Sequence, residues 1–171
     1  MESSDAELVK AACGGDVDSF RQLYERHYRL AVSVAHGRLS DRHLAEDAAQ
    51  EAFATVCRTL PTLRDGNRFP EWLGTICRRT ASRMTRSHTN GKPIDREPVS
   101  SEISADADAM RMRQAVERLP LPAREVINLH YFGGLSYEEI ARGLGISSQA
   151  VHGRLQRARK TLARLLSQDE T

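Results

Sequence analysis

The sequence predicts an all-α protein with two small helical domains joined by a flexible acidic linker, the second a helix-turn-helix domain. Two observations predict this architecture. Glycine and proline are scarce, at 11 and 6 of 171 residues, and no long run of valine, isoleucine or threonine occurs, so leucine- and alanine-rich helices are expected. The stretch from Ser87 to Ala109 has no apolar periodicity and carries two basic and five acidic residues, which is typical of a linker. We therefore place the linker at residues 89–106, between domains at residues 1–88 and 107–171.

Three helices are predicted in the first part of the first domain. A short helix spans Glu7 to Cys13 and ends at a glycine pair, and a long helix with a continuous apolar face runs from Val17 to about Leu39. A third helix starts at Ser40 and Asp41 and ends before Pro61. Off its apolar face lie the polar residues Asp47, Gln50 and Glu51.

A polar loop and a cationic fourth helix complete the first domain. The loop, Thr62 to Arg68, contains an Asp-Gly turn signal, and Pro70 suits the first turn of a helix from Glu71 to about Arg86. This helix has an apolar face and a rim of four arginines without an acid. The rim is either solvated or binds phosphates, and the charges by themselves do not separate these two interpretations. The four arginines are Arg78, Arg79, Arg83 and Arg86.

The second domain carries the more specific pattern. Helices over Ala107–Leu119 and Ala123–Phe132 end at prolines and at a glycine pair, respectively. Ser136 then begins a capping box with Glu139, and a Gly-Ile-Ser turn leads into a last helix from Ser148 to about Leu166. Two helices joined by such a short turn are typical of a helix-turn-helix domain.

The last helix suits the major groove of DNA. Its apolar residues form one narrow stripe, and from Ser148 to Leu166 it holds five basic residues and no acid. Amide and guanidinium groups can form two hydrogen bonds with one base edge, and cations bind phosphates. A three-helix module that docks proteins is the alternative interpretation. The candidate groove residues are Gln149, His152, Gly153, Arg154, Gln156, Arg157 and Lys160.

The sequence disfavours several other classes of protein. No apolar run approaches the roughly 18 residues of a membrane span, and the amino terminus is acidic, unlike a signal sequence, so we expect a cytoplasmic protein. No nucleophile with its base and no phosphate-binding glycine loop is recognisable, so we expect no enzymatic activity. Three cysteines without metal-ligand spacing indicate buried reduced thiols, with no metal and no cofactor. They are Cys13, Cys57 and Cys77.

Three stretches of the chain resemble one protein family. The segment LPLPAREVINLHYFGGLSYEEIARGLGISSQAVHGRLQRARKTL is similar to the promoter-reading domain of extracytoplasmic-function sigma factors, the smallest members of the major bacterial sigma superfamily. The segment AEDAAQEAF resembles the polymerase-binding helix of that family, and RFPEWLGTICRRTASRMTR resembles its promoter-melting helix. The two domains match in the right order and cover most of the chain, which is more specific than either match alone.

The resemblance implies a dissociable, monomeric subunit that binds core RNA polymerase, recognises a bipartite promoter and helps to open it. Its partners would be promoter DNA and the core enzyme, through the clamp of the largest subunit and the flap of the second largest. An anti-sigma factor is a further partner that the resemblance leaves open. Asp47, Gln50 and Glu51 would meet the clamp. In the polymerase cleft the linker would place acidic residues in a channel built for RNA, or would act as a passive tether; these residues are Asp95, Glu97, Glu102, Asp106 and Asp108.

The resemblance also assigns DNA contacts to particular residues. The polar loop would hold a flipped base of the minus-ten element through Arg64, Asp65, Asn67 and Arg68. The cationic helix would hold the exposed strand through Arg78, Arg79, Thr80, Arg83 and Arg86. The matching positions for the minus-thirty-five element are His152, Gly153, Gln156 and Arg157.

The chain departs from the family pattern WLYRIARN on the promoter-melting helix, where it reads WLGTICRR. Gly74 replaces an aromatic residue, Thr75 a basic residue and Arg79 an asparagine, so the family's base preference is not carried over at these positions. Gly74 should also weaken the helix by about 1 kcal/mol relative to alanine, unless a close approach of another backbone requires it.

Two rival functions stay open at this point. One is a helix-turn-helix repressor or activator that binds duplex DNA alone and dimerises through its first domain. The second cationic helix argues against it, because duplex binding does not require such a helix. The other rival is an adaptor or anti-sigma-like protein whose basic helices dock acidic partners. Gel shifts with and without core polymerase separate the three functions.

Overall fold

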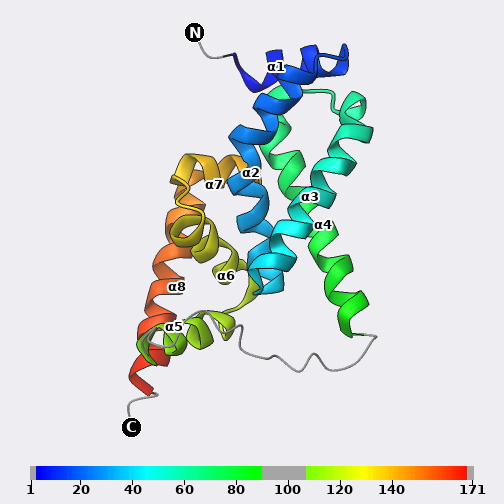
Figure 1. Ribbon diagram of the computed structural model, residues 1–171. Coiled ribbons are helices and arrows are strands. Elements are labelled where there is room, and N and C mark those ends of the chain that lie inside the picture. The colour runs from blue at the N-terminus through cyan, green and yellow to red at the C-terminus, as the bar shows by residue number, and fades with distance from the viewer. Residues whose placement is uncertain (1–2, 90–106, 169–171) are drawn as a thin grey trace.

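The computed structural model describes residues 3–89 and 107–168, and within these ranges the protein is built from eight α-helices without a strand (Figure 1). The all-α prediction is therefore confirmed. Residues 90–106 of the predicted linker, including Asp95, Glu97, Glu102 and Asp106, lie outside the described residues. At both of its ends, the stretch with linker-like composition, Ser87 to Ala109, is helical. Helix α4 continues to Thr89, and Asp108 belongs to α5.

The amino-terminal helices follow the predicted order closely. They are α1 (Asp5–Cys13), α2 (Val17–Leu39), α3 (Arg42–Thr59) and α4 (Phe69–Thr89). Three of these helices have a side-chain N-cap. The side chains of Ser4, Asp16 and Asp41 each accept a hydrogen bond from a backbone N–H of the first turn. Between α3 and α4 the predicted polar loop contains two short 3-10 turns, η1 (Leu60–Thr62) and η2 (Gly66–Arg68).

Helix α2 is the centre of this amino-terminal group. Both α3 and α4 pack along it, and each contributes fully buried side chains to a common core. The face that α3 turns inward consists mainly of alanines, so its backbone can approach α2 closely. The fully buried residues of α3 are Ala45, Ala48, Ala49, Ala52 and Val56.

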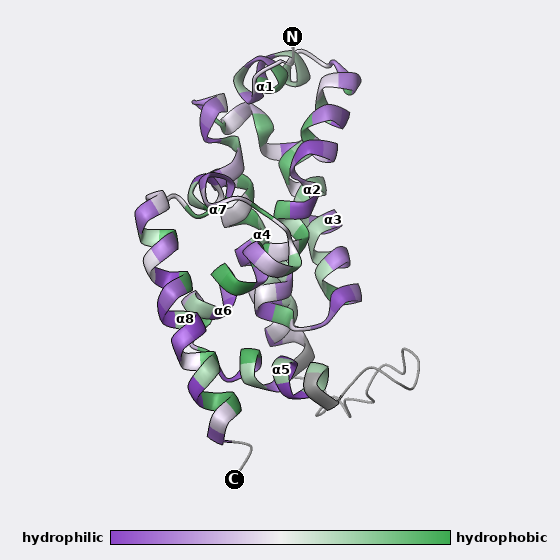
Figure 2. Cartoon of the chain, turned by 90° about the vertical axis from the view of Figure 1, so that its left-hand side faces the viewer, coloured by the Kyte–Doolittle hydropathy of each residue, from purple (hydrophilic) through white to green (hydrophobic). Residues whose placement is uncertain are grey.

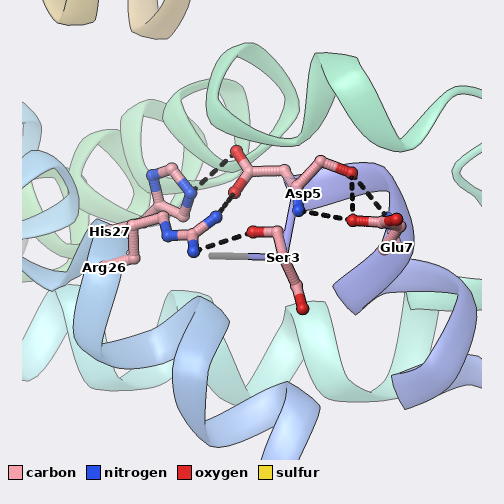
Figure 3. Close-up of polar contacts among 6 residues, drawn as sticks. Ser3, Asp5, Glu7, Arg26 and His27 are labelled. Carbon is pink, nitrogen blue, oxygen red and sulfur yellow. Dashed lines mark hydrogen bonds and ion pairs between the residues drawn. The ribbon is translucent and has the colours of Figure 1, made fainter. Parts of the chain in front are cut away.

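A cluster of charged residues fastens α1 to α2 (Figure 3). The carboxylate of Asp5 lies 2.7 Å from Nη1 of Arg26 and 2.9 Å from Nε2 of His27. Arg26 also donates to the carbonyl oxygen of Ser3 at 2.9 Å. Burial alone would raise the pKa of Asp5, but the hydrogen bonds and charges of His27 and then Arg26 outweigh it and hold this pKa below its ordinary value. The ionised carboxylate therefore stabilises the docking of α1.

The carboxy-terminal helices form a second group. They are α5 (Ala107–Glu117), α6 (Leu121–Ile127), α7 (Tyr137–Leu144) and α8 (Ser148–Gln168). The helix predicted over Ala123–Phe132 is α6 followed by a π-helical turn, η3 (Asn128–Phe132), which ends where Gly133 donates to the carbonyl oxygen of Asn128 at 2.8 Å. A longer hydrogen-bonded ring in the last turn thus interrupts the regular α-helix.

The predicted capping box and turn are confirmed. Ser136 accepts from the N–H of Glu139 at 3.2 Å, and the carboxylate of Glu139 accepts from the N–H of Ser136 at 2.7 Å. Gly145 ends α7 with φ of 65°, a left-handed conformation that glycine adopts without strain. The predicted apolar stripe of α8 is buried against α6 and α7 at Val151, Leu155, Ala158 and Leu162.

The two groups of helices pack against each other, with α7 against α4 and with α6 and η3 against α2 (Figure 1). At this contact a Cβ on Gly74 of α4 would overlap the carbonyl oxygen of Gly143 on α7. The close backbone approach named as the condition for Gly74 is therefore present. Nearby, the rings of His36 and Phe132 stack with their centroids 4.3 Å apart. Burial lowers the pKa of His36, which favours the neutral ring in this stack.

The three cysteines differ in their surroundings. Cys77 is buried in the core, as predicted, and burial raises the pKa of its thiol to about 12. Cys13 and Cys57 are exposed, so the prediction of burial was wrong for these two. Cys13 is the last residue of α1, and Cys57 lies on the exposed side of α3. Among the described residues, none of the helices combines the length and the apolar character needed to cross a membrane.

Candidate nucleic-acid interface

An arginine-lined hollow lies along the carboxy-terminal half of α4. Its volume is about 560 Å³, and no carboxylate is among the residues that line it in the described part of the chain. The structure thus brings together the four arginines of the predicted cationic rim, and it adds one arginine from α2 that sequence reasoning missed. The lining residues are Arg38, Thr75, Arg78, Arg79, Ser82, Arg83 and Arg86.

Thr80 does not belong to this surface. Its exposed fraction is only 5%, so its side chain lies in the core rather than along the arginines. Thr80 follows Cys77 by three residues, a spacing that places both on the same face of a helix. The helical period therefore predicts that Thr80 is buried with Cys77 and does not belong to the cationic rim.

Two arginines of the hollow already pair with carboxylates. Arg83 forms an ion pair with Glu51 on α3, and Arg78 lies 3.6 Å from a carboxylate oxygen of Glu125 on α6. The second pair is largely buried, with 21% of the Arg78 side chain and 9% of the Glu125 side chain exposed. Arg78 also donates to the hydroxyl of Thr75 at 3.2 Å. These two guanidinium groups would have to share or exchange partners to bind phosphates.

The loop before α4 presents polar groups that are mostly held by local bonds. Asp65 accepts hydrogen bonds from the backbone and side-chain nitrogens of Asn67 at 3.0 and 3.1 Å. Arg68 donates to both carboxylate oxygens of Glu71, at 2.7 to 3.0 Å. The four predicted pocket residues Arg64, Asp65, Asn67 and Arg68 are all exposed. The local bonds order the side chains of three of them while leaving polar atoms at the surface.

The three polar residues predicted for polymerase contact share one exposed face. Asp47, Gln50 and Glu51 lie on the side of α3 that faces away from its buried alanines. Acidic and amide groups on such a face suit a basic partner surface. Glu51 is the member that also touches α4, through Arg83.

Helix α8 presents the predicted polar face of the helix-turn-helix. Along much of the α8 ribbon the residues are hydrophilic, with apolar residues between them (Figure 2). Gln149, His152, Gln156, Arg157 and Lys160 are exposed, whereas Gly153 and Arg154 are half-buried. Arg159 is a further exposed cation of α8 that was not among the predicted groove residues. It donates to the hydroxyl of Tyr131 at 2.7 Å, and its guanidinium lies 5.6 Å from the centre of that ring. This contact joins residues that are distant in sequence, so the sequence does not predict it.

Comparison with known proteins identifies the family. Residues 23–90 match Sigma-70 region 2, and residues 109–162 match Sigma-70, region 4. The chain is 32% identical to the ECF RNA polymerase sigma factor SigM of Mycobacterium tuberculosis, over 96% of this chain and 86% of that protein. It is also 32% identical to the ECF RNA polymerase sigma factor BldN of Streptomyces coelicolor, over 95% of this chain, and it spans 66% of the length of BldN.

A solved structure agrees in fold over nearly the whole chain. The structure of CnrH in complex with the cytosolic domain of CnrY superposes with a TM-score of 0.67 and 28% sequence identity, covering 98% of this chain and 99% of CnrH. Two helical groups, each with a basic surface and each matching a Sigma-70 region, define a bacterial transcription initiation factor. The chain belongs to the ECF RNA polymerase sigma factors.

Proposed function

We propose that this sigma factor binds core RNA polymerase, recognises promoters at two separate elements and promotes melting of the DNA at the minus-ten element. The observation that carries the proposal is the arginine-lined hollow of α4, which occurs in the same chain as a helix-turn-helix with an exposed polar face. A protein that only reads duplex DNA needs the second feature and not the first. Single-stranded DNA requires a cationic surface that follows its backbone.

The proposal divides the chain into three parts. Residues 1–88 form region 2, which binds the polymerase and the minus-ten element, and residues 107–171 form region 4, which reads the minus-thirty-five element. Residues 89–106 connect them. The matches at residues 23–90 and 109–162 support this division. A chain with these tasks acts where polymerase and promoters are, in the cytoplasm.

Each surface has a distinct task in the proposal. Asp47, Gln50 and Glu51 bind the clamp of the largest polymerase subunit, and region 4 lies near the flap of the second largest. Exposed polar atoms of the loop at Arg64, Asp65, Asn67 and Arg68 hold a flipped base. Charged and amide groups of α8 at Gln149, His152, Arg154, Gln156, Arg157 and Lys160 contact base edges and phosphates, and Gly153 leaves space beside them.

A regulatory protein is part of the proposal. CnrH, which shares the fold over nearly its whole length, has been solved in complex with the cytosolic domain of CnrY. We propose by analogy that a protein of the anti-sigma class binds this chain when it is not on the polymerase.

Formation of open complexes on a promoter library tests the proposed function. Purified core polymerase is mixed with the full chain and a promoter library, and open complexes are detected by permanganate reactivity of unpaired thymines. We expect reactivity only when both the chain and the core enzyme are present. Replacing Asp47→Asn together with Glu51→Gln should weaken core association, whereas Glu25→Gln, an exposed acid on α2, is the matched control. Binding to promoter duplex without the core enzyme, and no open complex with it, would contradict the proposal.

A further inference from the structure

We propose that Arg38 of α2 is a phosphate-binding residue, so that the hollow on α4 holds the backbone of single-stranded DNA between two helices instead of along one. The inference rests on the proposed function and deepens it. It adds a residue from outside the promoter-melting helix and names the chemical group that this residue binds. The carboxy-terminal end of α2 lies beside α4, which is why Arg38 lines the same hollow as the arginines of α4 (Figure 1).

Arg38 is held in place without being neutralised. Its Nη1 lies 3.5 Å from the hydroxyl of Ser82, at the upper limit of a hydrogen bond. Its Nε is buried and has no acceptor among the described residues. In contrast, Arg78 and Arg83 of the same hollow face carboxylates. Because Nε is enclosed, a phosphate in the hollow would bind Arg38 through its Nη groups, in charge-assisted hydrogen bonds.

The composition of the hollow selects phosphate. Guanidinium groups bind phosphate through paired N–H donors, and they do so more strongly than through neutral hydrogen bonds. Ser82 adds a hydroxyl donor to the same lining, whereas the hydroxyl of Thr75 donates to the carbonyl oxygen of Glu71 at 3.1 Å. Five guanidinium groups exceed what one small anion requires, whereas successive phosphates of a strand carry one charge each. The occupant is therefore a DNA strand that enters between the ends of α2 and α4.

Salt dependence of strand binding provides the test. The full chain is assembled with core polymerase and titrated with a fork-junction DNA that carries a single-stranded minus-ten segment. Each phosphate contact on a single strand contributes about 0.7 to the slope of log K against log salt concentration. We expect Arg38→Gln to lower the slope by about this amount and Arg38→Lys to retain it. Arg21→Gln removes an exposed arginine from the other end of the same helix and should leave the slope unchanged.

Two further measurements separate the possible outcomes. In the wild-type complex, bound DNA should protect Arg38 from phenylglyoxal while Arg21 stays reactive, and this readout does not depend on how the variants fold. Inorganic phosphate at equal charge concentration should displace the fork DNA much less than a thymine oligonucleotide does. Absence of protection, or an unchanged slope for Arg38→Gln, would overturn the inference. Equal displacement by inorganic phosphate would show a small-anion site and overturn it too. Failure of the wild-type chain to bind core polymerase would instead contradict the proposed function.

Discussion

Arg83 on α4 forms an ion pair with Glu51 on α3. This pair connects two surfaces with different proposed tasks, since Glu51 belongs to the polymerase-binding face and Arg83 to the strand-binding hollow. Both side chains are well exposed, so the pair is accessible to competing partners. A basic group of the polymerase that takes Glu51 would release Arg83 for the DNA.

Substitution Arg83→Gln should therefore change the two proposed interactions in opposite directions. Exposed ion pairs contribute up to about 1 kcal/mol, so freeing Glu51 should strengthen core association by up to about fivefold. Strand binding should weaken, with the salt slope reduced by about 0.7. Fluorescence anisotropy with labelled chain and then with labelled fork DNA measures both. Arg58→Gln, which removes an exposed arginine of α3, is the control. Parallel loss of both affinities would contradict the coupling.

Substitution by alanine should have opposite effects on stability at two glycines in different helices. Gly74→Ala should separate α4 from α7, because its Cβ would overlap the carbonyl oxygen of Gly143. Gly153→Ala on α8 meets only the end of the Arg157 side chain, at 3.8 Å, and should raise the free energy of unfolding by up to about 1 kcal/mol through helix propensity. Urea denaturation measures the stability of both variants, and small-angle X-ray scattering should show a larger radius for Gly74→Ala only. A compact and stabilised Gly74→Ala protein would refute this account of the contact.

Acid should abolish the contribution of Asp5 to stability. The pKa of Asp5 is held below the ordinary value of 3.8, so its carboxylate stabilises the fold at higher pH and loses this effect as the pH falls through the lowered pKa. Asp5→Asn should therefore be less stable than the wild type from about pH 5 upward, and the difference should shrink toward about pH 3. Urea denaturation across this range measures it. A difference that is constant with pH would mean that the amide and the ionised carboxylate serve α1 equally well.

Two exposed residues of α8 should affect DNA binding in different ways. Gln156→Ala should weaken binding of the holoenzyme by about 1 to 3 kcal/mol at the preferred base pair and relax the preference there. Lys160→Gln should weaken all minus-thirty-five sequences alike and lower the salt slope by about 0.9. Binding to a set of single-base variants at two salt concentrations distinguishes these patterns. Uniform weakening by Gln156→Ala would place that side chain on the phosphate backbone.

Features that depend on neighbouring residues could be predicted from the sequence. The limits of α2, the cap at Ser136 and the buried stripe of α8 all follow from interactions within one or two helical turns. The burial of Thr80 follows from its spacing to Cys77, although the arginines on either side obscure it.

Features that depend on packing between distant helices could not be predicted in this way. Arg38 enters the hollow only because α2 and α4 lie side by side, and the pairing of Arg78 with Glu125 joins residues from the two helical groups. The π-helical turn at Asn128–Phe132 likewise has no local sequence signal, and η3 packs against α2. The condition at Gly74 could be stated in advance, but its fulfilment required the position of α7.

The contrast between the three cysteines offers a chemical assay that needs no engineered site. With a pKa of about 12, the sulfur of Cys77 is almost wholly protonated near neutrality and enclosed by the core, so alkylating reagents cannot reach a thiolate there. Cys13 and Cys57 remain open to such reagents. Folded molecules should thus gain two adducts in a mass spectrum. The fraction of molecules with a third adduct would measure how many have unfolded enough to expose Cys77.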